Sequence, residues 1–215
     1  KGARHLADPS RLIAGAKMVY GDKFEQLFDP IAPIPEERLL VKTEGDHLDI
    51  GPGCRLEFWD TPGHAKHHFS IVHPPSNGIF AGDTVGIRYE QLAKDGIDFF
   101  LPSTSPNQFD PLAMQSAIER FRSARFAAIY YGHYSMSTIP EEALVQVEQW
   151  LGIFVDEAKS VMAEGGSPAE LAGRLMKQVK IHLDALGVPE NHKVYEIIQL
   201  DVEVSSMGLM DSLSK

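Results

Sequence analysis

The first half of the chain is dominated by short apolar runs that alternate with turn residues. Five such runs lie between residues 38 and 83, separated by Gly, Pro, Asn or Asp: RLLVKTEG, DHLDIG, CRLEFWDT, HFSIVHP and GIFAGD. Runs of this length that are rich in β-branched and aromatic residues predict strands. Between the last two, Asn77-Gly78 predicts a tight hairpin, because these residues readily adopt the positive φ angles of such a turn.

The residues before these runs predict a helix and a loop. Asp8 or Ser10 is expected to cap a short helix that ends at Gly21, and the apolar side of this helix consists of Leu12, Ile13, Ala16 and Val19. The following segment, FDPIAPIPEE (28–37), carries three prolines. It therefore predicts an ordered loop without regular structure.

After residue 86 the spacing of apolar residues becomes helical. Asp110 and Pro111 predict an N-cap and a first helical residue in front of LAMQSAIERFRS. RFAAIYYGHY (125–134) then predicts one more buried strand, which ends in a polar loop.

From Pro140 onward the chain is expected to be entirely helical. PEEALVQVEQWLGIFVDEAKSVM repeats apolar residues at helical spacing, and KVYEIIQLDVEVSSMGLMDSL is amphipathic. Between them, SPAELAGRLMKQV opens with a capping box formed by Ser167, Pro168 and Glu170. Strands first, mixed elements next and helices last indicate an α/β core with a helical C-terminal extension.

Composition and charge narrow the function classes. A chain of 215 residues with 43% hydrophobic and 23% charged residues is typical of a globular protein with one domain and an appendage. The net charge of -10 argues against nucleic-acid binding, which needs clustered Lys and Arg. No apolar run approaches the roughly 20 residues that cross a bilayer. The single Cys54 excludes an intramolecular disulfide and fits a reducing compartment, so we expect a cytoplasmic protein.

Three predicted strands end in residues that can bind metal. TPGHAKHH places His64 after a Pro-Gly turn, AGDT places Asp83 at the mouth of an apolar strand, and YGHY places His133 after another. Imidazole nitrogen and carboxylate oxygen suit zinc, iron or manganese, and the shortage of cysteine excludes a thiolate-rich site. The pattern therefore predicts a metal centre built from loops.

Each of these residues also has an interpretation without metal chemistry. His133 alone fits a hydrogen-bonded loop histidine, and Asp83 alone fits an Asx-turn or a helix cap. His64 and His68 have the spacing of a helical zinc site, but the Pro-Gly turn favours a loop. His67 fits a solvated or supporting residue. The recurrence of one strand-to-loop pattern is what favours metal binding.

Taken in order, the motifs resemble those of the metallo-β-lactamase-fold hydrolase superfamily. TPGHAKHH is similar to the family's T-P-G-H-(x)3-H motif, AGDT to its bridging-aspartate motif, and YGHY to its final histidine motif. FLPSTSPNQFDPLAMQSAIERF is similar to the linker and helix before that last motif. The resemblance implies an αββα sandwich whose C-terminal part occupies residues 1–139, with residues 140–215 as the helical extension.

The resemblance also assigns roles to site residues. It implies that His64 binds the first of two metals, Asp83 bridges both, and His133 binds the second. His68 would be a supporting residue that orients a ligand.

One family motif is missing. No H-x-H-x-D-H run occurs in the chain, although in the family this run supplies the other metal ligands and the aspartate that orients the nucleophile. It lies upstream of the matched region. We therefore expect a missing N-terminal segment before Lys1 that is needed to complete the fold, and an isolated fragment that is inactive.

The expected function is that of a metal-dependent hydrolase. The resemblance implies metal-activated water acting on an ester, lactone, thioester or related small molecule, with two zinc ions or with iron or manganese. Asp83 and Tyr134 are the candidate catalytic residues. Tyr131 and Tyr134 flank His133, where a tyrosine hydroxyl either donates a hydrogen bond to an oxyanion or packs in the core. Two alternatives stay open: a non-heme iron oxidoreductase similar to sulfur dioxygenases, and a non-catalytic metal-binding domain. We expect a small-molecule substrate and no nucleic-acid or membrane partner, and we leave a homodimer open.

Overall fold

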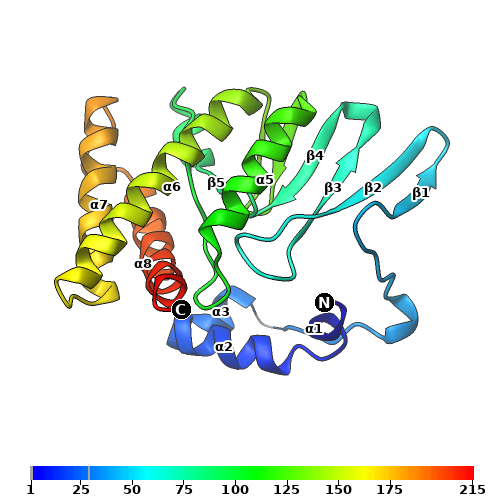
Figure 1. The fold of residues 1–215 in the computed structure, drawn as a ribbon, viewed down its shortest axis with the longest axis horizontal. Coiled ribbons are helices and arrows are strands. Elements are labelled where there is room, and N and C mark those ends of the chain that lie inside the picture. The colour runs from blue at the N-terminus through cyan, green and yellow to red at the C-terminus, as the bar shows by residue number, and fades with distance from the viewer. Residues whose placement is uncertain (1, 29) are drawn as a thin grey trace. The chain divides into compact units, whose positions relative to one another are not determined.

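The computed structural model describes residues 2–28 and 30–215, which divide into two compact units, Lys1–Thr43 and Glu44–Lys215 (Figure 1). The first unit holds α1 (Ala3–Ala7), α2 (Ser10–Tyr20) and α3 (Phe24–Phe28), with single 3-10 turns at Gly21–Lys23 and Glu36–Arg38. The helix predicted after Asp8 is confirmed as α2. The Asp8 carboxylate accepts a hydrogen bond from the Ser10 N–H at 3.1 Å, and Gly21 follows the helix with a φ of 52°.

Two other predictions for this region have different outcomes. The proline-rich loop has no helix or strand at residues 30–35, as predicted, but Phe28 is the last residue of α3 and a 3-10 turn begins at Glu36; Asp29 lies outside the described residues. The strand predicted for RLLVKTEG is wrong, because residues 39–43 pair with no strand among the described residues. Leu40 and Val41 are 69% and 65% exposed, so their apolar side chains do not mark a half-buried strand.

The second unit contains a six-stranded mixed sheet in the order β1-β2-β3-β4-β7-β8. Its strands are β1 (His47–Gly51), β2 (Cys54–Asp60), β3 (Phe69–His73), β4 (Gly78–Gly82), β7 (Ala128–Tyr131) and β8 (Met136–Ser137). The other four predicted runs between 46 and 83 and the buried strand in RFAAIYYGHY are therefore confirmed. The two-residue β8 was not predicted.

The connection between β3 and β4 differs from the predicted two-residue turn. A 3-10 turn at Pro74–Ser76 lengthens it, and only Asn77 is left-handed, with a φ of 45°. Gly78 is instead the first residue of β4. A side chain at Gly78 would lie 2.7 Å from the Tyr130 ring, so this glycine provides space for a neighbouring strand.

Strand direction brings three loops to the same edge of the sheet. β3 is antiparallel to both β2 and β4, so β2 and β4 run in the same direction, and β7 is parallel to β4. The carboxyl ends of β2, β4 and β7 therefore lie at one edge, which is where open α/β sheets commonly bind ligands.

The two faces of the sheet are covered differently. Ile79 and Ile129 pair across β4 and β7, are fully buried, and belong to one core cluster with Ile118 of the helix that follows β6. Because side chains alternate along a strand, the next residue points to the other face. There Phe80 is 45% exposed and stacks on Tyr130 with ring centroids 4.7 Å apart.

Residues 86–101 contain less helix than predicted. They form β5 (Ile87–Arg88), α4 (Glu90–Ala93) and β6 (Phe100–Leu101), and β5 pairs with β6. Two-residue strands are too short to show a period of two, which explains why the apolar spacing favoured a helix here.

The four long helices predicted from the sequence are present. They are α5 (Pro111–Ala124), α6 (Pro140–Ala163), α7 (Pro168–Ala185) and α8 (Val194–Leu213). The two for which caps were predicted, α5 and α7, have them. Asp110 accepts hydrogen bonds from the N–H groups of Leu112 and Ala113, both at 3.0 Å. Ser167 accepts from the Glu170 N–H, which is one half of the predicted capping box.

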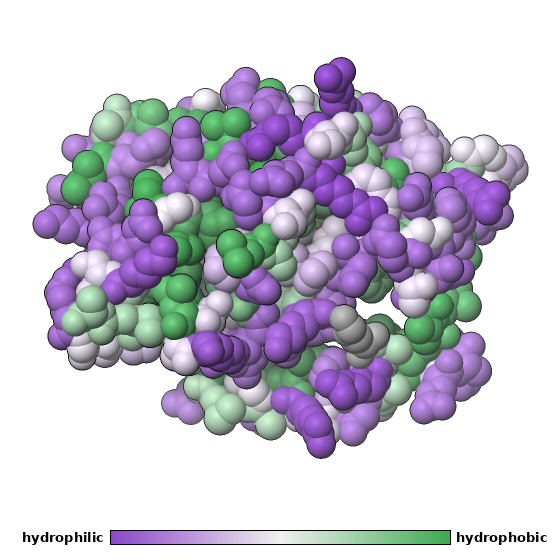
Figure 2. All heavy atoms as spheres, in the orientation of Figure 1, coloured by the Kyte–Doolittle hydropathy of each residue, from purple (hydrophilic) through white to green (hydrophobic). Residues whose placement is uncertain are grey.

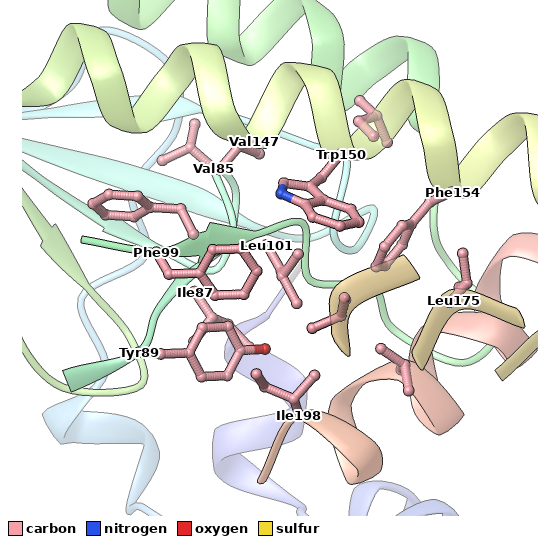
Figure 3. Packing of buried hydrophobic residues seen from close by; sticks show 14 of the residues in the cluster. Val85, Ile87, Tyr89, Phe99, Leu101, Val147, Trp150, Phe154, Leu175 and Ile198 are labelled. Atoms are coloured by element: carbon pink, nitrogen blue, oxygen red, sulfur yellow. The ribbon is translucent and has the colours of Figure 1, made fainter. Parts of the chain in front are cut away.

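The helical tail and the sheet region share one hydrophobic core. Figure 3 shows Trp150 and Phe154 of α6 beside Leu175 of α7, with Ile198 of α8 near the Tyr89 ring; all belong to one cluster. Residues on both sides of the boundary proposed between 139 and 140 belong to this cluster, and the boundary itself stays a prediction.

Polar residues dominate the face of the protein seen in Figure 2, with apolar residues in scattered patches. None of the helices in the described ranges has both the length and the apolar character required to cross a bilayer.

Candidate metal centre

The three predicted ligands lie at the shared carboxyl edge of β2, β4 and β7. His64 belongs to the loop after β2, Asp83 follows β4, and His133 follows β7 by one glycine. The His64 Nε2 atom lies 3.9 Å from Asp83 Oδ2, and the His133 Nε2 atom lies 3.5 Å from Asp83 Oδ1. Each oxygen of Asp83 thus faces a different histidine.

Two glycines allow these loops to come so close. A Cβ at Gly132 would lie 2.7 Å from Asp83 Oδ1 and 3.1 Å from the carbonyl carbon of Gly82, so any side chain there would separate His133 from Asp83. Gly82 has a φ of 53°, and a Cβ there would lie 2.5 Å from His68 Nε2. The glycines in AGD and GH are therefore required by the packing of the site itself.

Asp83 has an unsatisfied buried oxygen. Its Oδ1 atom is buried and has no hydrogen-bond partner among residues 2–28 and 30–215, although the side chain as a whole is 23% exposed. A buried carboxylate oxygen without a partner is costly, and structures normally satisfy it with a donor, a water or an ion. A cation bound between Asp83 and the histidines would give this oxygen a partner.

The ring of His64 is oriented for metal binding. Its Nδ1 atom lies 3.1 Å from the Ser103 carbonyl oxygen. A carbonyl can only accept a hydrogen bond, so Nδ1 carries the proton and Nε2 presents its lone pair towards Asp83. Burial lowers the pKa of His64, with smaller opposing effects that include the Asp83 charge. Burial thus favours the neutral form of the ring, which is the form that binds a metal.

His68 lies in the same loop but uses both ring nitrogens inside the protein. Its Nε2 accepts the backbone N–H of Asp83 at 3.1 Å, and its Nδ1 lies 2.6 Å from Thr84 Oγ1. The Thr84 hydroxyl donates to the Thr61 carbonyl at 2.8 Å, so it accepts from His68 Nδ1–H. Burial lowers the pKa of His68 to about 4. His68 therefore positions the Asp83 backbone and has no lone pair left for a metal.

The spacing of the donors suits ligands of a common ion. Two ligand atoms on one tetrahedral zinc, each at about 2.05 Å, lie about 3.4 Å from one another. The His133–Asp83 distance of 3.5 Å is close to this value, and the His64–Asp83 distance of 3.9 Å is slightly longer. No complete group of three or more metal-binding side chains is found among residues 2–28 and 30–215, so the arrangement consists of two pairs that share Asp83.

Comparison with known proteins identifies the fold. No protein-family model matches the chain. A metallo-β-lactamase fold-containing protein from Sulfurisphaera tokodaii is 24% identical over 178 residues, which are 82% of this chain and 61% of that protein. The crystal structure of an archaeal metallo-β-lactamase superfamily protein from Sulfolobus tokodaii matches 98% of this chain and 68% of its own, with 19% identity and a TM-score of 0.62. The chain has the metallo-β-lactamase fold.

A second structure supports this result. The metallo-β-lactamase family protein from Thermus thermophilus matches all of this chain and 63% of its own, with 14% identity and a TM-score of 0.63. The fold implied by the sequence motifs is therefore confirmed. The chain spans 61% of the length of the curated relative.

The metallo-β-lactamase fold generally binds divalent metals, and the donors described above are of the type that such metals prefer.

The tyrosines beside His133 occupy different environments. Tyr131 packs in the core, and burial raises the pKa of its hydroxyl. Tyr134 is 80% exposed with a φ of 70°, so it lies outside the packed part of the site.

Asp201 is a residue near this site that the sequence did not reveal. It lies on α8 and accepts a hydrogen bond from the Tyr89 hydroxyl at 2.9 Å. Burial is the main cause that raises the pKa of Asp201; His133 lowers it and Asp83 raises it, so Asp201 is within electrostatic range of both. Asp201 lies in an amphipathic helix, far along the chain from the loop motifs, so the sequence gave no signal that it is close to them.

A cavity of about 660 Å³ lies elsewhere, among α5, α6 and the end of α8. Lys66 from the His64 loop contributes to its lining, but His64, Asp83 and His133 do not. This cavity is therefore separate from the candidate metal centre.

Proposed function

We propose that the protein is a metal-dependent hydrolase of small esters, lactones or thioesters. The observation that supports this proposal best is the position of Asp83, whose two carboxylate oxygens face His64 and His133. Its Oδ1 atom is buried and lacks a hydrogen-bond partner in the part of the chain that the structure describes. A bound divalent metal would polarise the scissile carbonyl and lower the pKa of its bound water towards ~7.

The residues of this chain would share the work as follows. His64 Nε2 and Asp83 Oδ2 would hold one ion, and His133 Nε2 and Asp83 Oδ1 the other, because each pair faces a common space. His68 would keep the Asp83 backbone in place through its hydrogen bond to the N–H. Among divalent metal ions, zinc suits this set of imidazole and carboxylate donors best, and iron or manganese suits it too.

We further propose that the remaining ligands come from a segment outside these 215 residues. Zinc takes four ligands, and the three donors cannot complete two ions. The open sheet face supports this proposal, since Phe80 and Met136 are 45% and 47% exposed on it and β8 pairs Met136 with Tyr130. A second layer that covered these side chains would remove apolar surface from water.

Hydrolysis of a substrate panel by the zinc-loaded protein, with any residues encoded before Lys1 included, tests the proposal. We expect turnover of at least one ester, lactone or thioester, with loss of about a hundredfold or more in Asp83→Asn. Asp49→Asn, an exposed carboxylate on β1, is the matched control and should leave the rate unchanged. Zinc binding without turnover of any substrate would overturn the hydrolase proposal, as would unchanged turnover in Asp83→Asn.

A further inference from the structure

The loop before α5 holds His64 through both its ring and its backbone. Ser103 O lies 3.1 Å and Ser103 Oγ 3.2 Å from His64 Nδ1. Ser105 approaches the other end of the residue: its hydroxyl and its N–H both donate to the His64 carbonyl oxygen, at 2.6 Å and 3.1 Å. The tautomer and direction of the imidazole are therefore set by residues 103–105.

This loop in turn rests on α8. The Thr104 hydroxyl donates to the Ser205 carbonyl at 3.3 Å, and both residues are almost completely buried. Gly208 lies one turn further along the helix. A Cβ there would be 2.3 Å from the Ser105 carbonyl oxygen and 2.5 Å from Thr104 Oγ1. The Ser105 carbonyl belongs to the backbone, so it could make room for a Cβ at this distance only if the loop moved.

Helix α8 is itself fixed on both sides of this contact. Leu209 and Ile198 are fully buried in the core cluster, and Ile198 appears beside the Tyr89 ring in Figure 3. Asp201 accepts the hydrogen bond from the Tyr89 hydroxyl. A helix anchored in this way cannot shift to make room for a side chain at 208, so the adjustment would fall on residues 103–105.

We propose that α8 is a positioning element of the metal centre. Because Gly208 has no side chain, the helix packs closely against Thr104 and Ser105, and this contact orients His64. This inference rests on the proposed role of His64 as a metal ligand. It makes the C-terminal helix part of the site. Groups that hold the second nitrogen of a metal-binding histidine typically change metal affinity by 10–100-fold when they are disturbed.

Gly208→Ala tests the proposal, with Gly173→Ala as the matched control. Gly173 lies within α7, and a Cβ there would meet no atom of another described residue within 4 Å outside the backbone of its own helix and its chain neighbours. Two quantities are measured: zinc affinity, by competition with a chelator, and the solvent exchange rate of the His64 Nδ1–H proton in the metal-free protein, by NMR. We expect Gly208→Ala to weaken zinc binding by about tenfold and to speed the exchange, while Gly173→Ala changes neither.

Thr104→Val is the second variant, in case Gly208→Ala does not fold. It keeps the shape of the side chain and removes only the hydrogen bond to Ser205, and we expect it to speed exchange of the His64 proton. The inference would be overturned if Gly208→Ala folded and kept the wild-type proton exchange rate and zinc affinity. If Gly208→Ala did not fold, the same result for Thr104→Val would overturn it. If the wild-type protein bound no zinc while the variants still altered the exchange, the proposed function would fail and the positioning role would stand.

Discussion

His68 shows how closely a single residue of the site is specified. Both ring nitrogens have assigned partners, the Asp83 N–H and the Thr84 hydroxyl. His68→Ala would leave the Asp83 N–H without its acceptor and would take the His68 donor from the Thr84 hydroxyl, which keeps its bond to the Thr61 carbonyl. We expect this variant to lower the free energy of unfolding by about 2 kcal/mol. Urea denaturation of the metal-free protein measures this change.

His67→Ala is the neighbouring control for His68. The His67 ring lies 3.4 Å from Gln108 Oε1, a long and only partly buried contact. We expect a loss of about 0.5 kcal/mol or less in this variant. Equal losses in the two variants would show that His68 has no special positioning role.

Asp201 provides a pH-dependent prediction. Burial raises its folded pKa above the unfolded value, so the folded state binds this proton more tightly and loses stability as pH rises through the unfolded and then the folded pKa. Asn at this position can still accept from Tyr89 and has no proton to lose. In the metal-free protein, Asp201→Asn should therefore raise the free energy of unfolding, relative to the wild type, more at about pH 7 than at about pH 4, which is near the unfolded pKa of Asp.

Urea denaturation of Asp201→Asn across this pH range, in the presence of a chelator, provides the measurement. Asp49→Asn serves as the control, because Asp49 is exposed on β1 and should show no such trend. A stability difference for Asp201→Asn that does not vary with pH, or that is negative at neutral pH, would contradict the account.

At the same scale, the motifs located His64, Asp83 and His133, which the structure brings to one edge of the sheet. They did not reveal Asp201, because its partner Tyr89 is 112 residues away in sequence. The supporting contacts of Ser103 and Gly208 were missed for the same reason. A backbone carbonyl and an absent side chain leave no pattern in a sequence.

Among the secondary-structure elements, α5 has the clearest local signal. Asp110 caps it through two N–H groups, and the Asp110 N–H donates to the Gly63 carbonyl at 2.8 Å, beside His64. Asp110→Ala should lower the free energy of unfolding by about 1 kcal/mol, the usual cost of losing an N-cap.

Thermal or urea unfolding checks this value. Asp156→Ala removes an exposed carboxylate from the interior of α6, where it forms an exposed ion pair with Lys159 at 3.6 Å, and should change the free energy of unfolding little. If Asp110→Ala were as stable as Asp156→Ala, the cap would not contribute as the geometry indicates.

Elements were predictable from the sequence where local chemistry was strong. Capping residues and long apolar periodicity located α5 to α8, and turn residues bounded β1 to β4. The errors at residues 38–43 and 87–101 arose because strand formation depends on a partner, and two-residue strands carry no measurable period. The position of the β4–β7 pair, which creates the site, is a tertiary feature that only the family resemblance implied.

For the molecule as a whole, the fold is established and the chemistry is proposed. The small-molecule substrate, the homodimer and the covering N-terminal segment stay predictions. The central claim is that His64, Asp83 and His133 bind the same metal centre.

Zinc titration of the metal-free protein tests this claim most directly, in the wild type and in His64→Ala, Asp83→Asn and His133→Ala. His47→Ala on β1 is the control, because His47 lies on the edge strand of the sheet. We expect each of the three variants to lose about tenfold or more in affinity while His47→Ala binds as the wild type does. A wild type that binds no zinc, or three variants with wild-type affinity, would contradict the account.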